Sequence, residues 1–321
     1  MIGWGVVATG GIADVVTSDM KLVPDAEVRA VSSRDSAKAA AFASRHGIPR
    51  SYGDYHDMLR DPDVDVVYVA TPHSSHHVVA RNALLAGKAV LCEKPLTVSL
   101  RDAEDLVSVA RKQNVFLMEA MWTRFNPLIR LLRKLVADGV IGSIRSVHAD
   151  FGEPFAHNPA HRLWDPAAGG GSLLDLGVYP VSLAQMLLGE PESVASHGSL
   201  IDGVDAEAAL LLRYPNGVSA HLSSSLVGNY PIAATVVGTA GRIEIPPVFY
   251  RPTELVVIRP DALPERHTLE LHGFGYQYQI AEVDERMTAG DKESPEMPLE
   301  ETLAVMRTLT EALDQLGVSY P

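Results

Sequence analysis

Residues 2–13, Ile2-Gly3-Trp4-Gly5-Val6-Val7-Ala8-Thr9-Gly10-Gly11-Ile12-Ala13, decide the fold of the first part of the chain. The apolar run at the start predicts a buried strand, and the glycines after it predict a tight turn into a helix. The turn is a variant of G-x-G-x-x-G/A in which Ala8 stands at the first glycine. Gly10 would let the backbone approach a pyrophosphate, and Ala13 would let the helix pack close to the strand.

This turn predicts a dinucleotide site, because phosphates bind to the free N–H groups and the positive dipole end of a helix N-terminus. A plain tight turn is the alternative interpretation. The position at the first strand–helix junction of an alternating chain favours the dinucleotide. The residues expected to line the site are Ala8, Thr9, Gly10, Gly11 and Ile12.

Short apolar runs alternate with helical patterns through about the first 120 residues. The runs are rich in Val and Ala and carry few charges, as expected of parallel strands buried on both faces. The expected strands are Ile2–Ala8, Val28–Ser33, Val64–Ala70, Ala89–Cys92 and Val115–Ala120. The expected helices are Ile12–Met20, Ser36–His46, Tyr55–Arg60, Ser75–Ala86 and Ser99–Asn114. The alternation predicts an α/β fold with a doubly wound parallel sheet of the Rossmann type.

The pattern changes after about Arg124. Two helical stretches precede a series of strand-like runs, and Pro215-Asn216-Gly217 between two runs is a hairpin signal. The expected helices are Pro127–Asp138, Ser172–Leu188, Tyr276–Met287 and Leu299–Leu316, and the expected strands are Ala206–Tyr214, Val218–Leu226, Ala233–Gly238, Arg242–Ile245 and Leu255–Ile258. We therefore expect a dinucleotide-binding domain over residues 1–121. Residues 122–321 should form an α+β domain with a large, mostly antiparallel open sheet, and its last helix, about 299–316, is a candidate to pack back on the first domain.

The composition of the 321 residues, 46% hydrophobic and 21% charged, is that of a soluble globular protein. Lys and Arg number 27 and Asp and Glu number 40, a net charge of −13, so neither a nucleic acid nor a membrane is an expected partner. The single Cys92 excludes an internal disulfide and a cysteine-based zinc cluster. No apolar run approaches the roughly 18 residues of a membrane span, and the N-terminus has no signal-peptide pattern. We expect a cytoplasmic protein.

The end of the second expected strand bears on the choice of cofactor. NAD-binding versions of the fold place an acidic residue there for the ribose hydroxyls, but here Ser33 and Arg34 stand at that point. Arg34 could pair with a 2′-phosphate and stack on the adenine, and Ser33 could donate to the same phosphate. NADP(H) is therefore favoured over NAD(H). Asp35 is the opposing signal, unless it only caps the next helix.

Five blocks of sequence resemble a known family. They are Ala8–Ala13, Ala70-Thr71-Pro72 with His76, Glu93-Lys94-Pro95, Met118–Phe125 and Gly169–Tyr179. On these blocks, nearly the whole chain resembles the glucose–fructose oxidoreductase/inositol dehydrogenase (Gfo/Idh/MocA) family, and Met121–Phe125 with Tyr179 resembles its dihydrodiol dehydrogenase and NADP-dependent xylose dehydrogenase branch. The resemblance implies an NAD(P)-dependent oxidoreductase that forms a homodimer or a dimer of dimers through the sheet of its second domain. On the cofactor side it implies Thr71, Pro72, His76, Glu93 and Lys94.

The resemblance also implies that Lys94 is catalytic or positions the substrate, and that Asp175 and Tyr179 stand at the substrate side. Because Asp175 and Tyr179 lie four residues apart, they would project from one face of a helix. Gly177 between them would leave room for the substrate or the nicotinamide. Without the resemblance, Lys94 would be a surface lysine, Asp175 a capping residue with Ser172, and Tyr179 an ordinary helix–sheet contact.

The expected reaction is a reversible hydride transfer between nicotinamide and a carbinol or carbonyl carbon. We assign Tyr179 as the acid/base, Lys94 as the cation that lowers the pKa of a neighbouring tyrosine and holds the reacting oxygen, and Asp175 as the ligand of a neighbouring hydroxyl. Whether Tyr179 or Lys94 moves the proton stays open. The residues expected to bind the substrate are Trp122, Arg124, Arg162, Trp164, Asp175 and Tyr179.

Three alternatives concern metal, substrate and catalysis. No metal is expected, because His56, His73, His76 and His77 lack a carboxylate at ligand spacing. The substrate is expected to be a sugar, a cyclic polyol or a dihydrodiol, and a keto-sugar reductase of deoxysugar biosynthesis is the alternative enzyme. A non-catalytic dinucleotide-binding sensor is the alternative outside enzymes. The presence of an acid/base pair argues against a sensor, which has no need of one.

Overall fold

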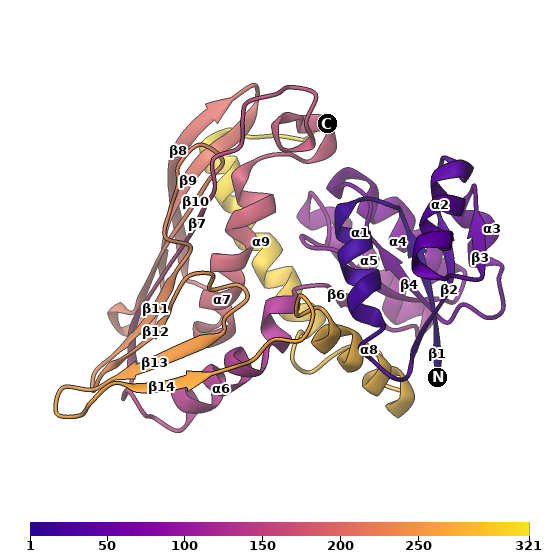
Figure 1. The fold of residues 1–321 in the computed structure, drawn as a ribbon. Coiled ribbons are helices and arrows are strands. Elements are labelled where there is room, and N and C mark those ends of the chain that lie inside the picture. Colours follow the sequence, from indigo (N-terminus) through magenta and orange to yellow (C-terminus); the bar gives the residue numbers. More distant parts are fainter. Residues whose placement is uncertain (321) are drawn as a thin grey trace. The chain divides into compact units, whose positions relative to one another are not determined.

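The structure is a computed structural model that describes residues 1–320 (Figure 1). The chain separates into two compact units. The first unit contains Met1–Trp122 and His272–Thr302, and the second contains Thr123–Leu271 and the residues from Leu303 on. The sequence-based domain boundary after residue 121 stays a prediction, and it does not include the return of His272–Thr302 to the first unit.

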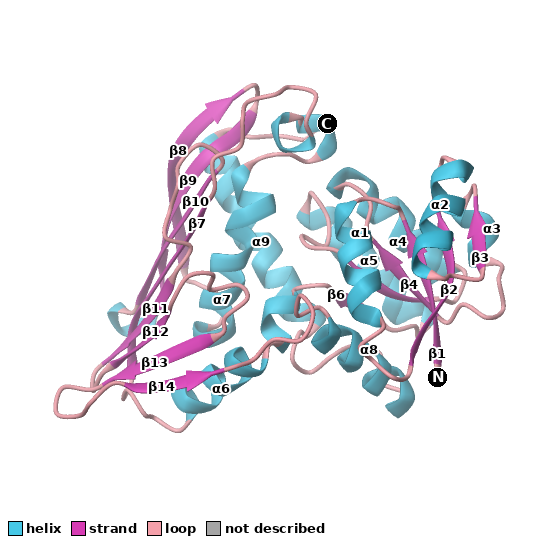
Figure 2. Ribbon diagram, in the orientation of Figure 1, coloured by secondary structure: helices cyan, strands magenta, loops and turns pink. Residues whose placement is uncertain are grey.

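A six-stranded parallel sheet forms the centre of the first unit, in the order β3-β2-β1-β4-β5-β6 (Figure 2). Its strands are β1 (Ile2–Val7), β2 (Ala26–Ser32), β3 (Arg50–Tyr52), β4 (Val66–Val69), β5 (Ala89–Cys92) and β6 (Leu117–Glu119). The helices between them are α1 (Gly11–Met20), α2 (Ser36–His46), α3 (Tyr55–Leu59), α4 (His76–Leu85) and α5 (Leu100–Gln113). Every residue of β4 and β5 is buried, as their apolar runs predict. The strand order reverses between β1 and β4, where sheets of this type bind ligands, and the predicted Rossmann fold is confirmed.

Hydrogen bonds to Asp19 of α1 attach the returning segment His272–Thr302 to the first unit. The buried Asp19 carboxylate accepts hydrogen bonds from the backbone N–H groups of Phe274, Gly275 and Tyr276 at 2.9–3.0 Å. Three donors compensate the cost of burying this charge. The loop therefore starts from a fixed point on the helix that follows the phosphate turn.

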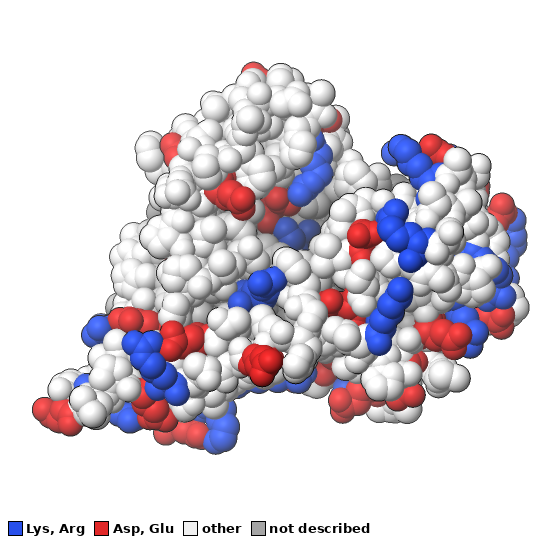
Figure 3. Space-filling model, viewed as in Figure 1, with Lys and Arg blue, Asp and Glu red and all other residues white. Residues whose placement is uncertain are grey.

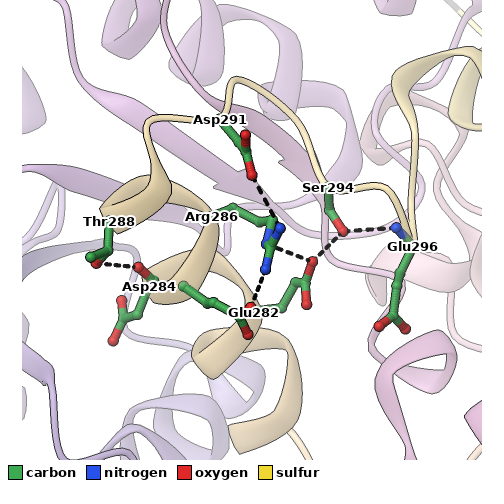
Figure 4. Close-up of polar contacts among 8 residues, drawn as sticks. Glu282, Asp284, Arg286, Thr288, Asp291, Ser294 and Glu296 are labelled. Atoms are coloured by element: carbon green, nitrogen blue, oxygen red, sulfur yellow. Dashed lines mark hydrogen bonds and ion pairs between the residues drawn. The ribbon is translucent and has the colours of Figure 1, made fainter.

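Polar contacts of α8 (Gln277–Ala289) hold the loop that follows it (Figure 4). Glu282 Oε1 accepts a hydrogen bond from Ser294 Oγ at 2.7 Å. The loop then reaches the edge of the parallel sheet, where the N–H of Leu117 in β6 donates to the carbonyl of Lys292 at 3.1 Å. The returning segment thus covers part of an edge strand that would otherwise expose unpaired backbone groups.

An eight-stranded sheet forms the second unit, in the order β14-β13-β12-β11-β7-β10-β9-β8. Its strands are β7 (Ile144–Gly152), β8 (Ser193–Ile201), β9 (Val204–Arg213), β10 (Ser219–Ser225), β11 (Ala234–Gly238), β12 (Arg242–Ile245), β13 (Glu254–Ile258) and β14 (Glu265–Thr268). Neighbouring strands are antiparallel except β7 and β10, which are parallel. The predicted, mostly antiparallel sheet is confirmed. Leu210 and Leu212 are buried on one face, whereas Leu211 between them is 47% exposed on the other.

The predicted hairpin between β9 and β10 forms at Pro215–Gly217. Asn216 and Gly217 adopt φ angles of 60° and 73°, which match the turns that join tightly paired strands. The N–H of Tyr214 donates to the carbonyl of Val218 at 2.9 Å and closes the turn. The asparagine–glycine pair is therefore a sequence signal with the expected structural outcome.

Helices cover one face of this sheet, and most of α7 is buried. The helical elements are η2 (Trp122–Phe125), α6 (Pro127–Ala137), η3 (Arg162–Trp164), η4 (Pro166–Ala168), the π-helical turn η5 (Leu173–Gly177), α7 (Val178–Leu188) and α9 (Leu299–Leu316). The stretch Pro166–Leu188 has the length and mean hydropathy, 1.3, of a membrane span, but 83% of its most apolar window is buried in the fold. Its burial is that of a core helix.

Candidate active site

The turn after β1 offers an open backbone. Ala8 has a φ of +98°, in the left-handed region where an alanine costs about 1–2 kcal/mol. Gly10 is the N-cap of α1, and no side chain caps this helix start. A Cβ built on Gly10 or Gly11 meets no other atom within 4 Å. The first turn of α1 thus presents uncapped N–H groups beside free space, which fits the pyrophosphate of a dinucleotide. Thr9 and Ile12 flank this turn and are half-buried.

After β2, Arg34 is exposed at the surface and Asp35 caps the next helix. Asp35 is the N-cap of α2, and its Oδ1 accepts hydrogen bonds from the N–H groups of Ala37 and Lys38 at 3.0 and 3.2 Å. The Arg34 side chain is exposed, and no residue between 1 and 320 pairs with it. The carboxylate that could have served a ribose is therefore already used to start a helix, whereas the guanidinium is available.

His76 ties together the loops that follow β4 and β5. Its ring is fully buried, with Nε2 2.9 Å from the carbonyl oxygen of Thr71 and Nδ1 2.9 Å from that of Pro95. Burial lowers the pKa of His76 to about 4, so the ring is neutral and donates to one of the two carbonyls. The ring therefore positions the Thr71–Pro72 turn. Direct contacts of Thr71, Pro72 and His76 with a cofactor stay predictions.

Lys94 follows Glu93, whose side chain is buried and hydrogen-bonded. The carboxylate of Glu93 is buried, and its Oε1 accepts a hydrogen bond from the Tyr68 hydroxyl at 2.5 Å. Burial, with the nearby Glu93 carboxylate, raises the pKa of Tyr68 well above its usual range. The partly exposed Lys94 lies close enough to His76 for its charge to oppose protonation of the ring. The Lys94 side chain thus starts just beyond the carboxyl end of β5, where ligands bind in this type of sheet.

Trp122 and Arg124, both expected to bind substrate, are buried to 2% exposure. In the first unit, the Trp122 ring lies 4.3 Å from the ring of Tyr276. In the second unit, Arg124 Nε donates to Ser182 Oγ of α7 at 3.1 Å. These contacts give both side chains a packing role. Their contact with a substrate stays a prediction.

Arg162 and Asp175, both expected at the substrate side, form a two-pronged ion pair. Arg162 Nη1 donates to Asp175 Oδ1 at 3.0 Å, and Nη2 donates to Oδ2 at 3.3 Å. The Asp175 side chain is 9% exposed and that of Arg162 is 47% exposed. Parallel guanidinium–carboxylate bonds fix the plane of the carboxylate. Trp164, two residues after Arg162 in the chain, is buried. Its indole N–H donates to the carbonyl of Ala156 at 3.2 Å.

Asp175 and Tyr179 arise from a π-helical turn that continues into α7. A π-turn is closed by i→i+5 bonds, so residues four apart still project from nearly one face. The Tyr179 ring is 7% exposed and lies 5.5 Å from Phe151 and 5.3 Å from Tyr250. The predicted room beside Gly177 is wrong, because a Cβ there would lie 3.0 Å from Ser224 Oγ of β10. Gly177 therefore allows the π-helical turn to pack against the sheet, and it does not leave space for a ligand.

Sequence reasoning misses two buried polar residues that support the predicted ones. Tyr68 is a lone hydroxyl in an apolar strand, which is a weak signal that a polar partner lies nearby. Asp205 is fully buried below the start of η5, and strand alternation gives no signal for it.

Within residues 1–320, no group of three or more His, Cys, Asp or Glu side chains is arranged to hold a metal ion. His77, one of the four histidines considered from the sequence, has its Nε2 2.8 Å from Asp105 Oδ2. The two residues are 28 positions apart in the chain, so no local spacing in the sequence indicates this pair.

A Rossmann unit with an open phosphate turn, and a second unit whose buried helix start carries Asp175 and Tyr179, define the class of two-part dinucleotide-binding oxidoreductases. Sequence comparison identifies the family. Residues 2–121 match the oxidoreductase family with an NAD-binding Rossmann fold, and residues 129–244 match the GFO/IDH/MocA C-terminal domain. The chain belongs to the GFO/IDH/MocA family and is an NAD(P)-binding oxidoreductase.

Three relatives cover nearly the whole chain. Trans-1,2-dihydrobenzene-1,2-diol dehydrogenase of Mus musculus is 39% identical over 99% of this chain and 98% of its own. KijD10, a 3-ketoreductase from Actinomadura kijaniata solved with NADP and TDP-benzene, has a TM-score of 0.86 at 30% identity, covering 98% of this chain and 97% of its own. Aldose-aldose oxidoreductase from Caulobacter crescentus, solved with glycerol, has a TM-score of 0.89 at 26% identity, with the same coverage. The chain is similar to dehydrogenases of CH–OH donors from end to end.

The open space at Gly10 yields a prediction. Gly10→Val should weaken binding of the NAD(P) cofactor by at least about tenfold, because the new side chain fills the space that we assign to the pyrophosphate. Folding should be little affected, since Gly10 has an ordinary φ of −78°. Gly171→Ala is the contrasting variant: its Cβ would lie 2.1 Å from Asp205 Oδ1, so it should lower the melting temperature instead. Fluorescence titration and thermal unfolding measure both. Unchanged cofactor affinity in Gly10→Val would rule out this phosphate site.

Proposed function

We propose that this protein is an NADP-dependent dehydrogenase or reductase that interconverts a CH–OH group and a C=O group of a sugar, a cyclic polyol or a dihydrodiol in the cytoplasm. The observation that carries the proposal is the end-to-end similarity to dihydrodiol dehydrogenase in a chain that contains Lys94, Asp175 and Tyr179. The proposal is tested by screening sugars, polyols and diols for reduction of NADP or NAD, measured by nicotinamide absorbance.

The proposed chemistry divides the work among four side chains. When bound, the nicotinamide accepts or supplies the hydride. In oxidation, the Tyr179 phenolate takes the proton from the substrate hydroxyl as the C–H bond breaks and the C=O bond forms, and in reduction the phenol returns that proton. The Lys94 ammonium favours the tyrosinate and stabilises charge on the reacting oxygen. Asp175, oriented by Arg162, accepts a hydrogen bond from a neighbouring hydroxyl.

In our proposal, the other residues on the substrate side support the catalytic groups and do not contact the reacting atoms. Trp122, Arg124 and Trp164 are almost fully buried, and the side chains of Arg124 and Trp164 bond to neighbours within the second unit. They therefore shape and stiffen the substrate side rather than solvate a hydroxyl. Arg162 keeps guanidinium N–H groups beyond the two that bind Asp175, and these can reach a further hydroxyl.

The preference for NADP(H) is supported by the end of β2. Arg34 is exposed and has no ion pair within residues 1–320, while Asp35 accepts two backbone N–H groups as a helix cap. A guanidinium can bind a 2′-phosphate with two parallel hydrogen bonds. KijD10, at 30% identity, is a relative solved with NADP.

A keto-sugar reductase is the second candidate function. The observation that favours it is the likeness to KijD10, a 3-ketoreductase, over 98% of this chain. Such a reductase would use the same Tyr179 and Lys94 in the direction of reduction. A keto-sugar that oxidises NADPH faster than any sugar or diol reduces NADP would favour this alternative.

The outer face of the sheet supports a homodimer or a dimer of dimers. In the view of Figure 3, charged side chains gather at the end of the second unit where β13 and β14 lie. Several outward positions on β7, β9 and β10 carry no Asp, Glu, Lys or Arg, namely Ser146, His148, Ala209, Leu211, Ser219, His221 and Ser223, whereas Glu207 and Arg213 lie on the same face of β9. A sheet face with few charges and an exposed leucine is usually covered by another protein surface. We propose that a second copy covers it.

Replacing Arg34 tests the cofactor preference. The wild type should bind NADP(H) at least tenfold tighter than NAD(H), a difference of about 1.4 kcal/mol. Arg34→Ala should remove most of that preference, whereas Lys38→Ala, an exposed cation one turn further along α2, should retain it. Titration calorimetry with both nucleotides measures the two ratios. Equal or tighter binding of NAD(H) to the wild type would contradict the proposal.

Replacing Tyr179 and Lys94 tests the chemistry. Tyr179→Phe and Lys94→Met should each lower kcat by roughly 10²–10⁴ while leaving NADP(H) affinity nearly unchanged. If both groups act on one oxygen, the double variant should be scarcely slower than the worse single variant. The apparent pKa that Tyr179 contributes to the pH–rate profile should be missing from Tyr179→Phe.

A matched control for these variants is Tyr214→Phe. It removes a buried hydroxyl of the same unit that has no hydrogen-bond partner within residues 1–320, so kcat should not change. Near-full turnover of folded Tyr179→Phe would refute the assignment and leave Lys94 as the proton-transfer candidate.

A charge on the outer sheet face tests the assembly. Leu211→Glu should convert the protein to a species near its chain mass of 34.6 kDa, because a desolvated carboxylate opposes the contact. Leu263→Glu alters a leucine that is 90% exposed outside the sheet and should leave the assembly intact. Light scattering at micromolar concentration measures the mass. A wild type of about 35 kDa would show that no stable dimer forms.

A further inference from the structure

We propose that Asp205, at the start of strand β9, is a positioning residue that holds Asp175 and Tyr179 in their reactive arrangement. The inference rests on the roles proposed above for those two side chains. Asp205 is fully buried in the second unit and makes its contacts at the point where the helix that carries them begins.

A bulge in β9 turns Asp205 toward this helix. Ser199 of β8 pairs with Glu207, but the next residue, Leu200, pairs with Asp205, so Ala206 is an extra residue in β9. Without the bulge, Asp205 would share the outward face of Glu207, two residues away. One extra residue re-aims a side chain, and bulges of this kind occur often next to active sites. The carboxylate is thereby placed inside the fold.

The Asp205 carboxylate holds the first residues of the π-helical turn. Its Oδ2 accepts hydrogen bonds from Ser172 Oγ at 2.7 Å and from the N–H of Leu173 at 2.6 Å. Its Oδ1 lies so near Gly171 that a Cβ on this glycine would be 2.1 Å away. Ser172 Oγ is also 2.9 Å from Ser224 Oγ of β10. Two neighbouring strands therefore set the position of Ser172 and Leu173.

The hydrogen bonds of Asp205 affect the positions of Asp175 and Tyr179, and also that of Arg162, the ion-pair partner of Asp175. Asp175 and Tyr179 follow Leu173 by two and six residues on continuous helix, so a displaced first turn moves both. The N–H of Gly171 donates to the carbonyl of Leu163 at 2.9 Å, next to Arg162. The glycine run thus connects the two sides of the Arg162–Asp175 ion pair. Misplacement of such groups by about 1 Å can cost about 10²-fold in rate.

The protonation state of Asp205 affects this anchor. Burial raises its pKa to about 6, although the Ser172 and Leu173 hydrogen bonds favour the ionised form. The titratable group that faces it is Tyr320, whose hydroxyl donates to the carbonyl of Gly170 at 2.7 Å and whose pKa is raised well above its usual range by burial and by Asp205. Above about pH 6 the ionised carboxylate can accept both hydrogen bonds. Below it, the neutral acid is a weaker acceptor than the carboxylate for the two hydrogen bonds at Oδ2, so the anchor is weakened as the pH falls.

The test is Asp205→Asn in the full-length protein, measured with the substrate found in the screen. We expect kcat to fall by about 10- to 100-fold while the NADP(H) dissociation constant changes less than about twofold. The acidic limb of the wild-type kcat profile near pH 6 should be absent from the variant. Ser172→Ala, which removes one of the two hydrogen bonds and keeps the carboxylate, should show a smaller loss of kcat in the same direction.

Asp61→Asn is the matched control. Asp61 is a buried carboxylate of the first unit that also accepts one hydroxyl, from Tyr52 at 2.9 Å, and one backbone N–H, from Asp63 at 3.0 Å, and it differs from Asp205 by an ion pair with Arg50 Nε at 2.8 Å. It should lower the melting temperature and leave kcat unchanged. If Asp205→Asn did the same, its role would be structural only and the proposal would be overturned.

Two further outcomes separate this proposal from the catalytic assignment. Full turnover of Tyr179→Phe would refute the role of Tyr179 but leave the loss of kcat in Asp205→Asn to be explained through Asp175. Should Asp205→Asn fail to fold, Ser172→Ala decides, and wild-type kcat and pH dependence in that variant would reject the anchor.

Discussion

The two parts of the candidate site depend on glycines that stand at the start of a helix, where the side chain is absent. At Gly10 and Gly11 the missing atom leaves space, no side chain caps α1, and a phosphate can approach the backbone. At Gly171 the missing atom leaves no space, because Asp205 lies against the backbone and accepts a hydrogen bond from the N–H of Leu173, the first residue of η5. One helix start is thus open to a ligand and the other is closed by the protein. The first suits an exchangeable cofactor, and the second suits side chains that must not move.

Local patterns predict most of the fold because most of its elements carry a local signal. Val-rich runs and the Asn216–Gly217 turn appear as expected, and the helix expected from Ser99 begins there, with Ser99 Oγ accepting a hydrogen bond from the N–H of Asp102 at 3.2 Å. The strands that sequence reasoning does not place as elements, β3, β7, β8 and β14, are short, polar or alternately exposed. The parallel pairing of β7 with β10 joins segments about 70 residues apart, and no short pattern encodes it. The return of 272–302 is likewise fixed by a distant carboxylate, Asp19.

The sequence predicts those site residues that stand in a recognisable motif. It does not predict residues whose role depends on burial or on contacts made only in the folded chain. Lys94 and Tyr179 stand in motifs, and the Arg162–Asp175 pair joins two residues already selected. Burial of Arg124 could not be foreseen, since an arginine is rarely placed inside a core. Asp205 is hidden by its bulge, because regular alternation places it on the outer face. The room beside Gly177 fails for a related reason, since a glycine permits any close approach and does not say which partner makes it.

Buried carboxylates paired with glycines recur in both units and explain how charge is tolerated inside them. Asp19 receives three backbone N–H groups, and a Cβ on the neighbouring Gly273 would lie 2.5 Å from its Oδ1. Asp205 receives an N–H and a hydroxyl, with Gly171 in the corresponding place. In each case the glycine has a positive φ, which turns the backbone so that donors of the following residues converge on one carboxylate. The carboxylate needs those donors to be buried, and the donors need the carboxylate because the turned backbone offers them no regular partner. Each glycine and its carboxylate therefore act as one unit, and the loss of either member leaves the other uncompensated.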